Sequence, residues 1–263
     1  SLVTLVLSRD TFSPEGERKE EYYLLLVLSV LGAVVLIQSS HMVSLLLGME
    51  LMGVALYAMI AFPERGQLPL EGAIKYLVLS ACASAMLLYG FALIYAATGE
   101  LSYAGIGAKG ALAYGENPML IMAGSAMVLA GIGFKLSVAP FHMWTPDVYE
   151  GAPTPVTGFL ATVSKGAVFV ALSRFYIEGV LYQYNGLNTA LVFLAIASML
   201  VGNWLALRQE NIKRLLAYSS IAHFGYLLVV LIALTYLDTG LVSQSITFYL
   251  AAYMVTTLAA FTV

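Results

Sequence analysis

Long apolar runs dominate this sequence and decide what it can fold into. A helix crosses a bilayer core of about 30 Å with about 20 apolar residues. Of the 263 residues, 60% are hydrophobic and 10% are charged, whereas soluble domains have about 25% charged residues. The sequence therefore predicts an all-α, polytopic bundle of transmembrane helices. The expected runs are 22–38, 42–62, 70–97, 119–139, 155–176, 187–207, 212–237 and 241–263.

The composition also excludes several classes of function. A net charge of −3 leaves no basic face that could neutralise phosphates, so nucleic acid is not expected as a partner. The single cysteine, Cys82, is compatible neither with a disulfide framework nor with a cysteine-rich metal site. The three histidines have none of the spacings of a zinc motif, and no glycine-rich phosphate loop is found. We expect no metal site and no cofactor site on this chain.

Both ends of the sequence resemble interrupted helices. It begins without methionine in the apolar stretch 1–8 and ends inside the apolar run 241–263. We therefore expect an internal piece of a longer protein.

Lysine and arginine residues between the runs predict the orientation in the membrane. Positively charged loops face the cytoplasm, and most positive charges fall on one side if each run crosses once. We therefore expect the loops before Tyr22, after Phe62, after Ala139 and after Leu207 to be cytoplasmic. The charges assigned to that side are Arg9, Arg18, Lys19, Arg65, Arg208, Lys213 and Arg214, against Lys109 and Arg174 on the other.

The segment 131–155 differs from the other runs because it contains four prolines. Pro140 lacks a backbone donor and clashes with the carbonyl four residues earlier, so the helix that carries Lys135 should break near Ala139. We expect a loop over residues 141–155. A broken helix at membrane depth is tolerated only where its freed backbone groups are buried in protein or line a wet cavity. Such interruptions point to transport sites.

Three charged residues fall inside predicted spans. Glu50 and Lys165 lie near the middle of their runs, and Lys135 lies about one turn before the expected break. Each such charge costs about 2.5–3.5 kcal/mol on insertion scales, so a functional role is the first hypothesis. The competing interpretation is a structural ion pair between Glu50 and one lysine, which leaves the other lysine without a carboxylate. We expect all three residues to transfer protons.

Three further residues are weaker candidates for a proton relay. Lys75 follows Glu71 by four residues and lies close enough to the end of its run to reach the interface. His142 lies just beyond the expected break, where it either relays protons or caps freed carbonyls. His223 lies inside its run, where a relay role and the role of an ordinary core histidine are both open.

Four stretches of the sequence are typical of one family. The sequence resembles subunit N, an antiporter-like membrane subunit of bacterial respiratory complex I, the NADH:quinone oxidoreductase. Its sister subunits and the multisubunit cation/proton antiporters share the layout but differ where this chain reads PFHMWTPDV. The stretches are LGMELMGVALYA (47–58), EGAIKYLVLSACASAMLLYG (71–90), GFKLSVAPFHMWTPDVYEGAPTPVTGFLATVSKGAVF (133–169) and NIKRLLAYSSIAHFGYLLV (211–229).

The resemblance implies a fold of two inverted five-helix repeats, each with one broken helix. Residues 1–21 would hold the end of a truncated helix and a cytoplasmic loop. Residues 22–176 would form the first repeat, with its discontinuous helix near Pro140. Residues 187–263 would begin the second repeat, whose broken helix and exit-side lysine would lie beyond Val263.

The resemblance also implies a function. Glu50 would pair with Lys135, and loosening of this pair would pass a proton toward Lys165, with Lys75 and His142 at relay positions. NADH, FMN, Fe–S clusters and quinone would reside in other subunits, and this chain would carry no redox centre. The expected partners are neighbouring antiporter-like and small membrane subunits in the bacterial inner membrane.

Two alternatives to this function stay open. One is a subunit of a related cation/proton antiporter, although a sodium site favours several carboxylates and only Glu50 is available inside the spans. The other is a non-conducting structural membrane subunit, in which apolar residues could replace the buried charges without loss of turnover.

Overall fold

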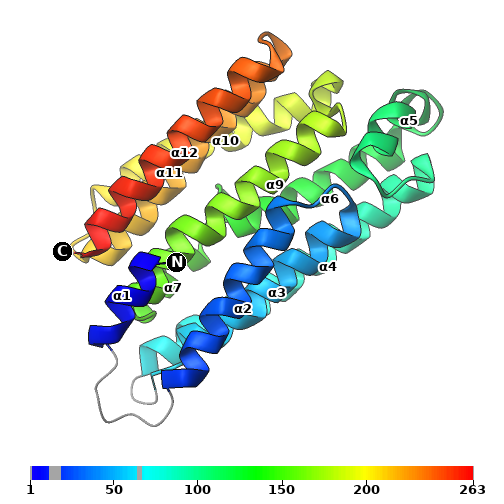
Figure 1. Cartoon of the computed structure of the whole chain (residues 1–263). Helices are drawn as coiled ribbons and strands as arrows, with labels where there is room; N and C mark the ends of the chain where they lie inside the picture. Colours follow the sequence, from blue (N-terminus) through cyan, green and yellow to red (C-terminus); the bar gives the residue numbers. More distant parts are fainter. Residues whose placement is uncertain (1, 12–18, 64–66, 263) are drawn as a thin grey trace.

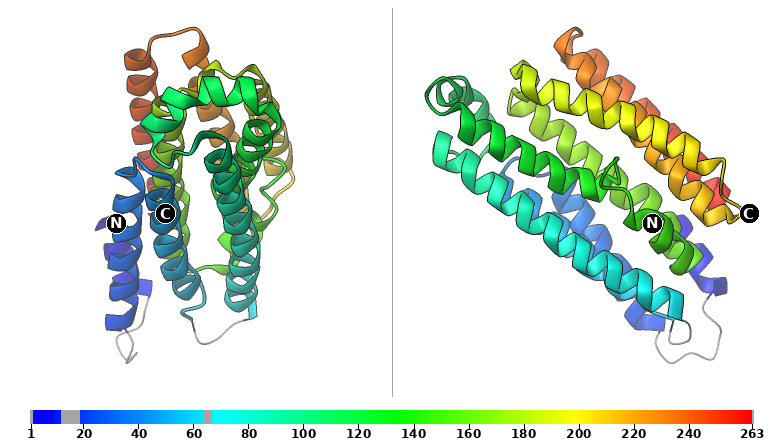
Figure 2. Two further views of the ribbon diagram at one scale, coloured as in Figure 1. Left: turned by 90° about the vertical axis from the view of Figure 1, so that its right-hand side faces the viewer. Right: turned by 180° about the vertical axis from the view of Figure 1, so that it is seen from behind.

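The computed structural model describes residues 2–11, 19–63 and 67–262. In these ranges the chain is nearly all helical, and an isolated bridge between His41 and Ser102 is the only β-type pairing. The long helices run side by side in a bundle (Figure 1; Figure 2). The α-helices are α1 Leu2–Thr11, α2 Lys19–Ile37, α3 Met42–Ile60, α4 Gln67–Thr98, α5 Tyr103–Glu116, α6 Pro118–Leu136, α7 Trp144–Gly151, α8 Thr154–Phe159, α9 Lys165–Glu178, α10 Asn185–Ala206, α11 Ile212–Ile232 and α12 Thr239–Thr262.

Three short stretches of other helix types connect or extend these elements. The π-helical turn Leu160–Ser164 joins α8 to α9 within one span. The 3₁₀ turn Leu181–Gln183 follows α9, and Ala233–Thr235 extends α11.

Eight helical stretches in the described ranges are long and apolar enough to cross a membrane. Each overlaps one of the eight runs expected from the sequence, so the all-α transmembrane bundle is confirmed. The division into repeats at 22–176 and 187–263 stays a prediction, and Arg18 and Arg65 lie outside the described residues. The spans are Glu20–Ile37, Met42–Ile60, Gln67–Thr98, Pro118–Leu136, Thr154–Glu178, Asn185–Ala206, Ile212–Thr235 and Thr239–Thr262.

Glycine allows α4 and α6 to approach closely. A Cβ atom on Gly90 of α4 would lie 2.7 Å from the carbonyl oxygen of Gly124, and one on Gly124 of α6 would lie 2.9 Å from that of Gly90. Both distances are shorter than van der Waals contact, so a larger residue would push the helices apart. Small residues at helix contacts are typical of membrane proteins, because lipid gives apolar side chains no reason to prefer a neighbouring helix.

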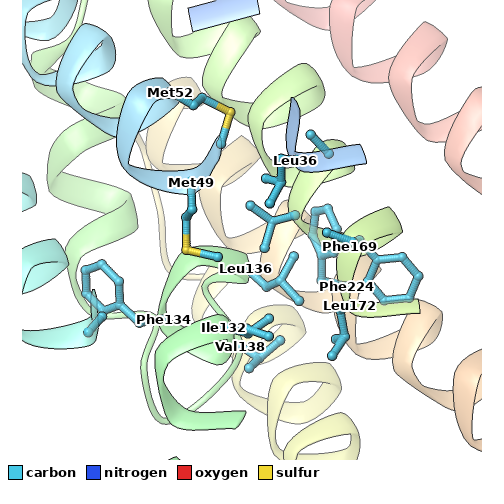
Figure 3. Packing of buried hydrophobic residues seen from close by; sticks show 14 of the residues in the cluster. Leu36, Met49, Met52, Ile132, Phe134, Leu136, Val138, Phe169, Leu172 and Phe224 are labelled. Carbon is cyan, nitrogen blue, oxygen red and sulfur yellow. The ribbon is translucent and has the colours of Figure 1, made fainter. Parts of the chain in front are cut away.

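The buried core joins the helices around the broken helix. Side chains from α2, α3, α6, α9 and α11 meet there, among them Leu36, Met49, Ile132, Phe169 and Phe224 (Figure 3). Large apolar side chains also cover the outside of the bundle, where Phe193 and Phe248 are 69% and 79% exposed. An apolar exterior of this kind fits lipid as the surrounding solvent.

Helix α5 is absent from the runs expected from the sequence. Its 14 residues are too short to span a bilayer, and several glycines lower its helix propensity. Ser102 begins the helix by accepting a hydrogen bond from the amide of Gly105 at 3.2 Å. The helix lies at one end of the bundle (Figure 1).

The expected helix break is confirmed, but it lies earlier than the sequence indicates. Helix α6 ends at Leu136 because Ser137 adopts a left-handed backbone conformation with φ of 62°. The amide of Val138 then donates to the carbonyl of Gly133 at 3.0 Å, which closes the last turn. Pro140, joined to Ala139 by a cis peptide bond, lies in the turns that follow.

The loop expected over residues 141–155 is wrong in part. Helix α7, Trp144–Gly151, occupies the middle of it. The prolines of this segment led us to expect a loop. Pro146 nevertheless lies in the first turn of α7, where a helix tolerates proline.

The conformation of Ser137 makes a stability prediction. Its side chain is fully buried, its hydroxyl has no hydrogen-bond partner in the described part of the chain, and its φ is positive. We expect Ser137→Gly to raise the free energy of unfolding by about 1 kcal/mol, because glycine adopts this conformation without strain. Thermal unfolding of the full-length protein in mild detergent measures the change. Ser137→Val is the control and should destabilise; an equal effect of both substitutions would contradict the prediction.

Candidate functional site

Lys135 lies in the last turn of α6, directly before the helix ends, and its side chain is almost completely buried. Its ammonium donates a hydrogen bond to the hydroxyl oxygen of Ser80 on α4 at 2.5 Å. The hydroxyl of Tyr57 on α3 donates to the same oxygen, also at 2.5 Å. The serine oxygen, which has two lone pairs, therefore joins the lysine and the tyrosine.

Glu50 lies half-buried in the middle of α3, and its carboxylate accepts a hydrogen bond from Ser84. Ser84 follows Ser80 by one helical turn on α4, so the two hydroxyls lie on the same face of that helix. Glu50 and Lys135, which the resemblance pairs, thus contact neighbouring serines and form no direct ion pair, although both are described. The carboxylate still attracts the ammonium through space. We call Glu50, Tyr57, Ser80, Ser84 and Lys135 the Lys135 group.

Lys165 is the first residue of α9 and is fully buried. Its ammonium donates to the hydroxyl oxygen of Ser220 on α11 at 2.7 Å. It also lies 5.9 Å from the ring centre of Trp144, 5.1 Å from that of Tyr149 and 5.7 Å from that of Phe224. Aromatic faces attract cations, so these rings replace part of the lost hydration. No carboxylate of the described residues contacts this ammonium.

The π-helical turn Leu160–Ser164 immediately precedes Lys165. Such turns are rare, occur often at functional sites, and free backbone groups from the usual helical pattern. The carbonyl of Ala161 accepts a hydrogen bond from the hydroxyl of Tyr253 on α12 at 3.1 Å. The helix therefore changes its register beside the buried charge, and no sequence pattern had indicated this.

Two polar groups beside the helix break have protein partners. The amide of Ala139 donates to the hydroxyl of Ser198 on α10 at 2.9 Å. The indole nitrogen of Trp144 donates to the carbonyl of Phe134 at 3.0 Å, which attaches α7 to the end of α6. This is the condition under which a break at membrane depth is tolerated.

Charged residues form a second group, which we call the end cluster: Lys75, Asp147, Glu150 and Arg214. The ammonium of Lys75 lies 2.6 Å from the carboxylate of Glu71 and 2.8 Å from that of Asp147. Arg214 lies 2.9 Å from Asp147 and 2.8 Å from Glu150. The cluster joins the N-terminal parts of α4 and α11 to α7, so these three parts of the chain lie on one side of the bundle. That grouping agrees with the expected orientation, whereas the identity of the side stays a prediction.

The pKa of Asp147 follows from this cluster. Partial burial raises the pKa of its carboxyl, but the hydrogen bonds from Lys75 and Arg214 and their positive charges outweigh that effect. The pKa of Asp147 is therefore held below its usual value. Lys75 itself is 40% exposed and contacts these carboxylates rather than the Lys135 group.

The two candidate relay histidines lie apart from both lysines. Burial lowers the pKa of His142, and the nearby backbone carbonyl of Pro140 opposes this only in part. The ring of His142 lies 6.5 Å from that of Tyr218. The ring of His223 shares a hydrogen bond with the hydroxyl of Tyr249 at 2.7 Å. Neither histidine contacts Glu50, Lys135 or Lys165, so their relay roles stay predictions.

Several site residues were not singled out from the sequence. Ser80 and Ser84 could have been identified from the sequence, because two hydroxyls one helical turn apart in an apolar run indicate a polar face. Trp144 and Tyr149 could not have been identified in this way, since their position beside Lys165 depends on the unexpected helix α7. In the described part of the chain no three His, Cys, Asp or Glu residues are grouped as a metal site would need.

The chain is similar to known membrane proteins along most of its length. A family model described as NADH:quinone oxidoreductase/Mrp antiporter, TM, matches residues 39–263. The NADH-quinone oxidoreductase subunit N of Ectopseudomonas mendocina (strain ymp) is 52% identical over 243 residues, which make up 92% of this chain and 48% of that protein. The subunit N of Methylococcus capsulatus (strain ATCC 33009 / NCIMB 11132 / Bath) is 49% identical over 261 residues, or 99% of this chain and 52% of that protein. The chain thus spans about half the length of these relatives.

Solved structures share the fold. A chain of respiratory complex I from Thermus thermophilus with bound aureothin matches with a TM-score of 0.81 and 39% identity, over 100% of this chain and 55% of that one. A chain of the membrane-bound sulfane sulfur reductase, an archaeal respiratory membrane complex, matches with a TM-score of 0.80 and 29% identity. The match covers 99% of this chain and 53% of that one. A chain of the Mrp complex from Dietzia sp. DQ12-45-1b matches with a TM-score of 0.78 and 22% identity, over 90% of this chain and 43% of that one. At this identity the match shows a shared fold and no more.

The end cluster makes a prediction about pH. Because the pKa of Asp147 is lowered on folding, its carboxylate stabilises the fold above the pKa of an unfolded aspartate, about 3.9, and this contribution is lost as pH falls through the lower folded value. We expect the difference in unfolding free energy between the native protein and Asp147→Asn to stay constant from pH 7 to about pH 5 and to shrink below about pH 4. Unfolding in detergent at each pH measures it. A difference that does not change with pH would contradict a lowered pKa.

Proposed function

The chain belongs to the transmembrane family of NADH:quinone oxidoreductases and Mrp antiporters, and from that premise we propose that it is the proton-translocating part of subunit N of a bacterial complex I. The identity of 52% and 49% to proteins named NADH-quinone oxidoreductase subunit N supports this choice of subunit. The antiporter alternative has weaker support, since the Mrp complex chain is 22% identical.

One observation carries the proposal: two lysine side chains are buried inside membrane-spanning helices, and neither contacts a carboxylate of the described residues. A charge at this depth is costly unless it has a task. A purely structural bundle would place each ammonium directly against an acidic partner. Here both ammonium groups contact serine hydroxyls, which can donate and accept hydrogen bonds and therefore tolerate either protonation state of the amine.

In the mechanism we propose, Glu50 holds a positive charge on Lys135 by attraction across the Ser80–Ser84 face of α4. When a neighbouring subunit shifts α3 or α4, this attraction weakens and Lys135 gives its proton toward Lys165. Restored attraction at the Lys135 group then favours a new proton there, and repulsion between the two ammonium groups drives the earlier proton onward. The three groups titrate as one coupled set.

In the proposed complex, the redox cofactors and the quinone site belong to other subunits. We propose that NADH, FMN, Fe–S clusters and quinone are held by other subunits, and that antiporter-like and small membrane subunits flank this one. The bacterial inner membrane is its location, with the end cluster on the cytoplasmic side. The positive charges near that cluster, Lys213 and Arg208 among them, support this orientation.

The proposal predicts a ranking between two lysines. We expect Lys165→Met to lower the initial rate of NADH-driven acidification of inverted membrane vesicles by about tenfold, which corresponds to a barrier raised by roughly 1.4 kcal/mol. Lys75→Met should change it by less than about twofold, because exposed ion pairs contribute little.

Both variants should be compared at equal amounts of assembled complex, measured on native gels, in the full-length protein. Equal and small effects of the two substitutions would argue for a structural membrane subunit. A larger effect of Lys75→Met would place the proton path through the end cluster.

A further inference from the structure

Two stacked aromatic rings lie between the contacts of the two buried lysines. The rings of Tyr76 on α4 and Trp144 on α7 are 4.6 Å apart at an angle of 23°. The ammonium of Lys135 lies 5.9 Å from the ring centre of Tyr76, and that of Lys165 lies 5.9 Å from the ring centre of Trp144. Each lysine therefore contacts a different member of the stack.

The stack is buried and fixed in place. Tyr76 and Trp144 are each 2% exposed. The indole nitrogen of Trp144 is held by the carbonyl of Phe134, whose ring lies on the Trp144 ring at 5.4 Å. Among the described residues, Ser80 accepts a hydrogen bond from Lys135 and Ser220 accepts one from Lys165, so the two lysines share neither serine. Protons move along hydrogen-bonded groups or water, and a ring face offers neither.

We propose that the Tyr76–Trp144 stack is a barrier that separates the two lysines and must open for each proton transferred. This inference rests on the proposed function and adds two positioning residues to it. In the transfer, an N–H bond of the Lys135 ammonium breaks and one forms at the neutral amine of Lys165, so the positive charge moves with the proton. Opening the stack admits the water that relays it, and closing prevents its return.

The position of α7 suits this role. Trp144 begins the short helix, and Asp147, three residues later, holds Lys75 and Arg214 in the end cluster. A displacement of α4 against α11 would therefore pull on the helix that carries one ring of the stack, whereas the other ring is on α4 itself. The barrier is thus connected to the two halves of the bundle.

Passive proton leak tests the barrier. Inverted vesicles with the full-length protein in its complex are given a pH gradient without NADH, and its decay is followed with a pH-sensitive dye. We expect Trp144→Ala to increase the leak severalfold, because water can then join the two lysines. Trp144→Phe keeps a ring in the stack and should not leak. Trp204→Ala is the matched control, since this second tryptophan is 66% exposed on α10.

A double variant shows whether the leak uses the lysines. Adding Lys165→Met to Trp144→Ala should abolish the extra leak, whereas a leak through a damaged bundle would persist. Persistence in the double variant, or no leak from Trp144→Ala in fully assembled complex, would overturn the barrier. If Trp144→Ala does not assemble, Tyr76→Leu opens the stack from the Lys135 side and is judged by the same outcomes.

The two proposals fail in different ways. If Lys165→Met alone leaves NADH-driven acidification intact, the proposed function is wrong. If Lys165→Met blocks acidification and Trp144→Ala causes no leak, the function stands and the barrier is wrong.

Discussion

Burial of the Lys165 ammonium without a carboxylate contact from the described residues is the constraint on which the rest of the site depends. An ammonium that loses its hydration needs substitutes, and the structure provides the Ser220 hydroxyl together with aromatic faces. Two of those rings, Trp144 and Tyr149, belong to α7. That helix can exist only because α6 stops at Leu136 and the chain turns before continuing. The helix break, often regarded as an ion-binding feature in itself, here delivers the aromatic surroundings of a buried cation.

The second lysine has a different environment, and the difference gives the pair a direction. Lys135 lies near the Glu50 carboxylate and shares the Ser80 hydroxyl with Tyr57. Lys165 has hydroxyl and ring contacts only. A movement of α3, which carries Glu50 and Tyr57, changes the electrostatic surroundings of Lys135, whereas the contacts of Lys165 come from α7 and α11. Under the proposed function, a signal from a neighbouring subunit would act on Lys135 and reach Lys165 through charge repulsion.

Most of the fold could be read from the sequence, because lipid imposes long apolar runs whose ends are marked by charged and turn residues. The three charged residues inside the spans, Glu50, Lys135 and Lys165, could be found for the same reason. Their surroundings could not. Helix α7 was hidden by Pro146, which fits its first turn, and α5 by its glycines, whereas the π-helical turn before Lys165 has no sequence signature. A direct Glu50–Lys135 contact was implied by the family resemblance, whereas packing places a serine against each group.

The most direct test of the central claim, that the buried charges move protons rather than hold helices together, is a charge-free variant of the Lys135 group. Glu50→Gln with Lys135→Met removes both charges while keeping similar volumes, and an apolar replacement of buried charges is often neutral for stability. NADH-driven acidification of inverted vesicles is measured beside the amount of assembled complex. The account predicts normal assembly with acidification lost. Full acidification by this double variant would contradict it.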